Sequence, residues 1–200
     1  MLIYDDSFAA VMAAGQREAA ALGAHEYGSE HMLLGLLAAG GPLVERISNA
    51  DSGVNLDGVR QAIDSSVDDA PHLQRLGLSR VDSPPAPAKS ARTPRNRHTS
   101  ELQVSLNSGT AKWGQLRKAG RLTKERKLDS AVLWLAVLEP TARAAKLLRA
   151  MGSDPDQLRS AVLGALAAPG TAAPEWPTEV RPGPVTRLVH WLFNRRSTSP

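Results

Sequence analysis

The sequence predicts an all-α protein of about eight helices, built as two four-helix repeats related by a pseudo-two-fold axis. Hydrophobic residues make up 42% of the chain but aromatic residues only 4%, because Ala and Leu dominate. That composition favours helices. Apolar residues recur at helical spacing, and no strand-like alternation lasts long enough to indicate a sheet. The two halves also repeat the same order of capping residues and apolar segments, which indicates an internal duplication.

The first half predicts four helices, over residues 6–22, 29–37, 42–48 and about 56–69. Gly23 follows the first helix, where a helix C-terminus favours glycine. Ser29 is a typical N-cap for the second helix. The segment "EHMLLGLL" after Ser29 is almost wholly apolar, so this short helix is expected to be buried on all sides.

The second half repeats this order. Its long first helix has an apolar stripe of Leu102, Leu106, Gly109, Trp113 and Leu116. Asp129 is expected to cap the apolar helix "SAVLWLAVLE". Pro140 is expected to open "TARAAKLLRAM", and Asp154 with Pro155 to open the last helix.

Composition divides the chain into four parts: a first repeat (1–79), a linker (80–98), a second repeat (99–168) and a tail (169–200). The linker has four prolines and little apolar bulk, which predicts a flexible segment. The formal charges of the four parts are −7, +4, +5 and +2, which sum to the net +4. The tail contains a further proline-rich stretch and "VTRLVHWLFNRR", a short amphipathic helix suited to docking in a groove.

Two segments carry a resemblance to a known family. "LGAHEYGSEHMLLGLL" (22–37) resembles the Clp N-terminal domain signature, in which Gly-Thr-Glu-His precedes a Leu-rich run. "AAKLLRAMGSDPDQLRSAV" (144–162) resembles the third and fourth helices of the same repeat. The chain looks like a ClpC-type double repeat standing alone, because no Gly-x-x-x-x-Gly-Lys-Ser/Thr phosphate loop of an AAA+ module occurs.

The resemblance implies a non-catalytic domain that binds proteins. Clp N-terminal domains dock substrates and adaptors, and some ClpC-type domains bind phosphorylated arginine through the motif glutamate, which matches Glu30. By spacing, Asp5 occupies the position of the family's phosphate-binding Thr, and a carboxylate there would repel phosphate. A peptide segment with an unmodified Arg or Lys is therefore the better ligand. The second repeat has Ser130 at the glutamate position. His31 completes the expected peptide site.

The expected partners are therefore a Clp ATPase or its client proteins. The chain would act either as an adaptor that brings clients or as a decoy that sequesters them. Cyclic peptide antibiotics, which bind ClpC-type domains, are further candidate ligands.

A metal site around His25 and His31 and an enzymatic activity of the chain are weaker interpretations of the sequence. A zinc helix needs His-Glu-x-x-His, but His25 and His31 are six residues apart and His25 precedes the helix. No Gly-x-Ser-x-Gly elbow occurs either. We expect neither a metal nor a cofactor.

Nucleic-acid binding is the main alternative function. Six of the eleven residues in 117–127 are basic, namely Arg117, Lys118, Arg121, Lys124, Arg126 and Lys127. Such a run can contact phosphates without sequence preference. Against it, the chain has no recognition-helix motif and little aromatic interleaving, so we regard nucleic acid as the less favoured partner.

Cysteine usage and hydropathy predict a cytoplasmic location. The chain has no cysteine, which fits a reducing compartment. No apolar run approaches the ~20 residues of a membrane span. The first twenty residues carry acids early and lack a basic start, unlike a signal peptide.

Overall fold

The computed structural model describes residues 3–24, 26–67, 97–122, 127–167 and 170–179. The helices of the first repeat are α1 (Asp6–Ala21), α2 (Ser29–Ala39), α3 (Pro42–Ala50) and α4 (Leu56–Val67). Those of the second are α6 (Ser100–Lys118), α7 (Ser130–Val137), α8 (Arg143–Ala150) and α9 (Pro155–Leu166). These eight helices in the described part confirm the predicted all-α class.

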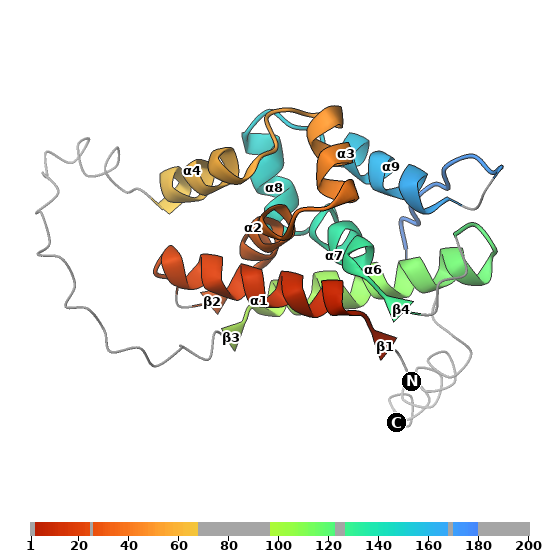
Figure 1. The fold of residues 1–200 in the computed structure, drawn as a ribbon, viewed down its shortest axis with the longest axis horizontal. Coiled ribbons are helices and arrows are strands. Elements are labelled where there is room, and N and C mark those ends of the chain that lie inside the picture. The colour runs from red at the N-terminus through yellow and green to blue at the C-terminus, as the bar shows by residue number, and fades with distance from the viewer. Residues whose placement is uncertain (1–2, 25, 68–96, 123–126, 168–169, 180–200) are drawn as a thin grey trace, which may run out of the picture.

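Four two-residue strands, which the sequence did not predict, join the two repeats. They are β1 (Ile3–Tyr4), β2 (Glu26–Tyr27), β3 (Arg97–His98) and β4 (Lys127–Leu128). β1 pairs with β4 and β2 with β3, both in parallel register. In each pair, one strand leads into the first helix of one repeat and the other into the second helix of its partner, so the exchange is reciprocal. The pairs lie near opposite ends of α1 (Figure 1).

The central layer consists of the two short apolar helices. Figure 1 shows α2 and α7 between the long helices α1 and α6 on one side and α3, α4, α8 and α9 on the other. Leu33 and Leu34 of α2 and Trp134 of α7 are at most 1% exposed and belong to one hydrophobic cluster drawn from both repeats. Burial of the second helix of each repeat, expected from its composition, is thus confirmed.

Glycines allow α1 and α2 to cross at close range. A Cβ built on Gly35 would lie within 3 Å of the α1 backbone at Gly15 and Val11. A Cβ on Gly15 would in turn lie within 3 Å of Tyr27 and of the His31 carbonyl oxygen. Both positions therefore require glycine for steric reasons.

Polar contacts repeat the reciprocal exchange. The backbone N–H of Ser130, at the start of α7, donates to Ser7 Oγ near the start of α1 (3.1 Å). At the other end, Ser29 Oγ donates to Oε1 of Glu101 in α6 (2.8 Å) and accepts from the Ala144 N–H in α8 (3.0 Å). Two serines of the first repeat therefore accept backbone N–H groups at the starts of α7 and α8 in the second repeat.

Two predicted helix starts are wrong. Gly28, not Ser29, is the N-cap of α2, because the Ser29 hydroxyl is already committed to Glu101 and α8. Pro140 does not open α8, which begins at Arg143 after an Ala142 cap. Asp129 and Asp154 are the predicted caps, and their side chains accept from the N–H groups of Ala131 and Asp156.

The predicted domain boundaries remain predictions. Most of the linker 80–98 and the tail helix in 180–200 lie outside the described residues.

Candidate functional site

Glu30 lies in the first turn of α2, where a helix N-terminus favours a carboxylate. Its side chain is 16% exposed and folds back over the Cα of Gly28, so a side chain at that N-cap would displace the Glu30 carboxylate. Oε1 lies 3.7 Å from a guanidinium nitrogen of Arg143 in α8. Oε2 is buried and has no hydrogen-bond partner among the described residues. Glu30 thus retains unused acceptor capacity beside one loosely held cation.

His31 has a structural role at the same helix terminus. Its Nδ1 accepts the backbone N–H of Gly28 (3.1 Å), which satisfies a donor that the glycine N-cap leaves free. Burial lowers the pKa of His31; the nearby Glu30 carboxylate opposes this shift, and Arg143 adds to it. The 3.5 Å approach of Glu30 Oε1 to Nδ1 is therefore not an ion pair, because His31 is neutral there and uses Nδ1 as an acceptor.

A cavity of about 400 Å³ opens beside Glu30. It lies between α2, α4 and α8 and is lined by Glu30, Ile63, Ser66, Arg143, Lys146, Leu147 and Ala150. The apolar wall suits an aliphatic side chain, and the charged groups suit a polar one. The cations come from the second repeat, so the site is less acidic than the first repeat alone predicts.

Glu101 organises the surroundings of this cavity. Oε1 accepts the Ser29 hydroxyl and the backbone N–H of Arg143 (2.9 Å). Because Ala142 provides no side-chain cap, Glu101 and Ser29 satisfy the free N–H groups of α8 from outside. This contact fixes the first turn of α8, and with it the position of Arg143. The sequence indicated no role for Glu101, since its partners lie on other helices.

Asp5 does not lie beside Glu30. It is the N-cap of α1, where Oδ1 accepts the N–H of Phe8 (3.1 Å) and the hydroxyl of Ser7 (2.6 Å). Through Ser7 it adjoins the start of α7, whereas Glu30 adjoins α6 and α8. The N-cap of α6, Thr99, is the first-helix residue on the Glu30 side, and it lies 3.5 Å from Glu101 Oε2. The structure thus places the start of each first helix beside the start of the second helix of the other repeat.

The site position in the second repeat also shifts by one residue. With Gly28 and Asp129 as equivalent caps, Ala131 rather than Ser130 corresponds to Glu30. Ala131 is 1% exposed. No carboxylate occupies this position in the second repeat.

The predicted basic patch is only partly described. Lys124 and Arg126 lie outside the described residues, and of Lys127 only the backbone, in β4, is described. Arg117 lies over the ring of Trp113, with its guanidinium carbon 5.2 Å from the ring centroid. Lys118 and Arg121 are exposed and form no ion pair with another described residue.

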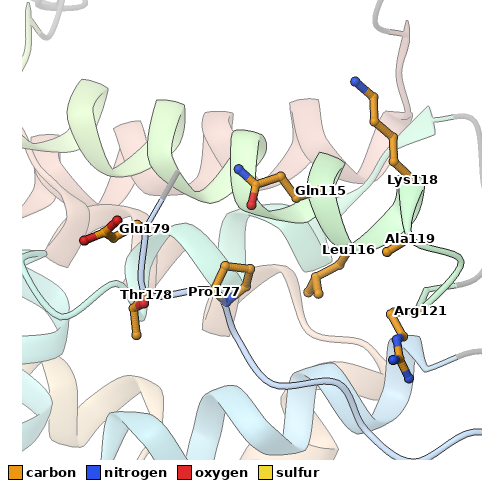
Figure 2. A pocket seen from close by; sticks show the side chains of 8 residues that line it. All are labelled: Gln115, Leu116, Lys118, Ala119, Arg121, Pro177, Thr178 and Glu179. Carbon is orange, nitrogen blue, oxygen red and sulfur yellow. The ribbon is translucent and has the colours of Figure 1, made fainter. Parts of the chain in front are cut away.

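A larger cavity, of about 690 Å³, lies at the C-terminal end of α6. Figure 2 shows Gln115, Leu116, Lys118, Ala119 and Arg121 on one side and Pro177, Thr178 and Glu179 on the other. A second space of about 370 Å³ adjoins it and shares Leu116 and Arg121. The sequence did not indicate this groove, because one wall comes from the predicted tail.

Comparison with solved structures identifies the architecture. The chain is similar to the crystal structure of the N-terminal domain of ClpD, a caseinolytic protease associated chaperone from Arabidopsis thaliana, with a TM-score of 0.56. The fold is that of a Clp N-terminal domain. The alignment covers 81% of this chain and 96% of that chain at 17% sequence identity. At this identity the comparison shows the Clp N-terminal fold but does not distinguish a ClpC-type domain from other types. No protein-family model and no curated protein matches the sequence.

Within the described ranges, no group of three His, Asp or Glu side chains is placed to hold a metal ion. None of the described helices is long and apolar enough to cross a membrane.

Proposed function

We propose that the chain is a non-catalytic protein-binding module that acts as an adaptor or a decoy in Clp-dependent proteolysis. The observation that carries the proposal is the Glu30 cavity. A buried carboxylate oxygen without a partner lies next to an open, partly apolar cavity, on a fold shared with a Clp N-terminal domain.

The ligand that suits this cavity is a peptide segment with an arginine or lysine. A guanidinium has five N–H donors in a planar fork, which matches a carboxylate with a free oxygen. The aliphatic stem of such a side chain can pack on Ile63 and Leu147.

Arg143 is the internal competitor for this interaction. Its side chain is 56% exposed and 3.7 Å from Glu30, so the contact is weak and exchanges readily with a ligand cation. Arg143→Ala is therefore expected to strengthen binding of a basic peptide, while Glu30→Ala weakens it and leaves folding nearly intact.

The test is retention of proteins from nuclease-treated host lysate on the immobilised full chain, with Glu30→Ala and Glu45→Ala as a matched pair. Glu45 is an exposed glutamate on α3 and does not line the cavity. A Clp ATPase or its clients should be retained by the unsubstituted chain and by Glu45→Ala, but much less by Glu30→Ala. Equal retention by both variants would exclude Glu30 as the contact, and retention of ribonucleoprotein alone would contradict the proposed function.

A degradation assay separates adaptor from decoy. The chain is added to a reconstituted Clp protease with one of the retained clients. An adaptor increases the rate of client degradation, whereas a decoy decreases it in proportion to its concentration. No change in either direction would contradict both roles.

A further inference from the structure

Residues 170–179, "GTAAPEWPTE", pack against the second repeat through a single aromatic side chain. Pro174, Trp176 and Pro177 are half-buried, and the other seven residues are exposed. Trp176 is the member of this segment that packs against the hydrophobic core. We call residues 170–179 the strap.

Trp176 covers a buried ion pair. Lys112 Nζ in α6 donates to Oε2 of Glu139, just after α7, at 2.7 Å, and their side chains are 6% and 4% exposed. The Trp176 indole N–H donates to the other oxygen, Oε1, also at 2.7 Å. Lys112 Nζ lies 5.8 Å from the Trp176 ring centroid, within cation–π range. A half-buried tryptophan with a satisfied N–H is typical of the aromatic anchors of binding interfaces.

The strap fills its groove incompletely. The spaces of about 690 and 370 Å³ flank it, on the sides of Pro177 and Pro174 respectively. Glu179 of the strap lines one space together with Lys118 and Arg121, and Glu175 lines the other together with Arg121, in neither case as a close ion pair between these described residues. The groove therefore has room and charge to accept a larger acidic segment.

From these contacts we infer that the groove along α6 is a second peptide-binding site, which the strap occupies in cis. Its ligand is an extended peptide segment that carries a tryptophan flanked by proline and acidic residues, like the strap itself. The indole binds over Lys112 and Glu139, and the acids lie towards Lys118 and Arg121. This site is separate from the Glu30 cavity and does not depend on the function proposed for it.

Intramolecular occupation makes the site regulated. A tethered segment has an effective concentration of about 1 mM, so a free peptide of similar chemistry competes poorly until the strap is released. A partner with a bulkier or more acidic segment gains contacts in the two unfilled spaces and displaces the strap.

The experiment measures binding of a fluorescein-labelled peptide, Thr-Ala-Ala-Pro-Glu-Trp-Pro-Thr-Glu, to the full chain by fluorescence anisotropy. Trp176→Ala removes the anchor and should bind the peptide at least tenfold more tightly than the unsubstituted chain does. Thr178→Ala, an exposed change in the same strap, should bind like the unsubstituted chain. A peptide with alanine in place of tryptophan should bind none of them.

Several results would overturn the inference. Circular dichroism first establishes that Trp176→Ala is folded. If it is not, Trp176→Phe keeps an aromatic ring but removes the indole N–H donor, and it should give a smaller increase in affinity. If the peptide bound the unsubstituted chain and the chain released by substitution of Trp176 with equal affinity, or did not bind the released chain, the strap would be a purely structural segment. Tighter binding of single-stranded DNA than of the peptide by the released chain would assign the surface to nucleic acid.

Discussion

The Lys112–Glu139 pair allows a quantitative test of the packing in the second repeat. At 2.7 Å and an effective dielectric constant of about 20, two unit charges attract by about 6 kcal/mol, which the loss of hydration of both ions largely cancels. Lys112→Met keeps the aliphatic packing and leaves the Glu139 carboxylate buried, with Trp176 as its remaining side-chain donor among the described residues. Breaking such a pair costs about 3–5 kcal/mol, and the retained indole bond favours the lower value. At ~3 °C per kcal/mol, the midpoint of thermal unfolding should fall by about 10 °C.

Two matched variants define the result. Lys118→Met changes an exposed lysine of the same helix and should alter stability by no more than about 0.5 kcal/mol. Adding Glu139→Gln to Lys112→Met should recover at least half of the loss, because the amide oxygen still accepts the indole N–H and no buried charge remains. Both are measured by denaturant unfolding followed by circular dichroism. If Lys112→Met proved as stable as Lys118→Met, the pair would be hydrated and the reasoning refuted.

Three further predictions concern the first repeat and its contacts. Gly35→Ala should destabilise by about 1–3 kcal/mol, because its Cβ meets the α1 backbone, whereas Gly164→Ala, with no atom within 4 Å, should stabilise α9 by up to ~1 kcal/mol; chemical denaturation distinguishes them. The lowered pKa of His31 means that the unfolded chain binds the proton more readily, so stability should decrease as pH falls through about 6.5, the ordinary histidine value. His31→Gln, which can still accept the Gly28 N–H, should remove that part of the pH dependence, and an unchanged profile would contradict the assignment. Glu101→Ala should cost about 1–3 kcal/mol and increase amide hydrogen exchange in the first turn of α8; unchanged exchange there would exclude the cross-helix cap.

Local signals predicted most of the helices. Asp129 and Asp154 accept from the first turns that follow them, so sequence spacing alone located α7 and α9. Ser29 failed as a predicted cap because its hydroxyl bonds two helices more than 70 positions away, and no local pattern reports such a contact. The two-residue strands are too short for any alternation to show.

The candidate site was predictable only in part. Glu30 and His31 were identified from their motif, and both lie at the start of α2 as expected. Arg143 and Lys146 belong to the other repeat, so their place beside Glu30 depends on how the repeats pack. Trp176 lies in a proline-rich stretch whose composition indicates a tail, yet its indole meets an acceptor 37 residues earlier in the chain.

The reciprocal exchange between the repeats affects the order in which this protein can fold during synthesis. β2 cannot pair until β3 has been synthesised, and Ser29 cannot form its hydrogen bonds until Glu101 and Ala144 have been synthesised. Ala144 lies roughly 100 residues after the end of α2. At ~5–20 residues per second, the ribosome takes roughly 5–20 s to add that length. During this interval the apolar surface of α2 lacks its contacts with α6, α7 and α8. The nascent first repeat therefore exposes apolar surface of the kind that chaperones bind, and a stalled or truncated chain would keep the same leucine-rich helix exposed.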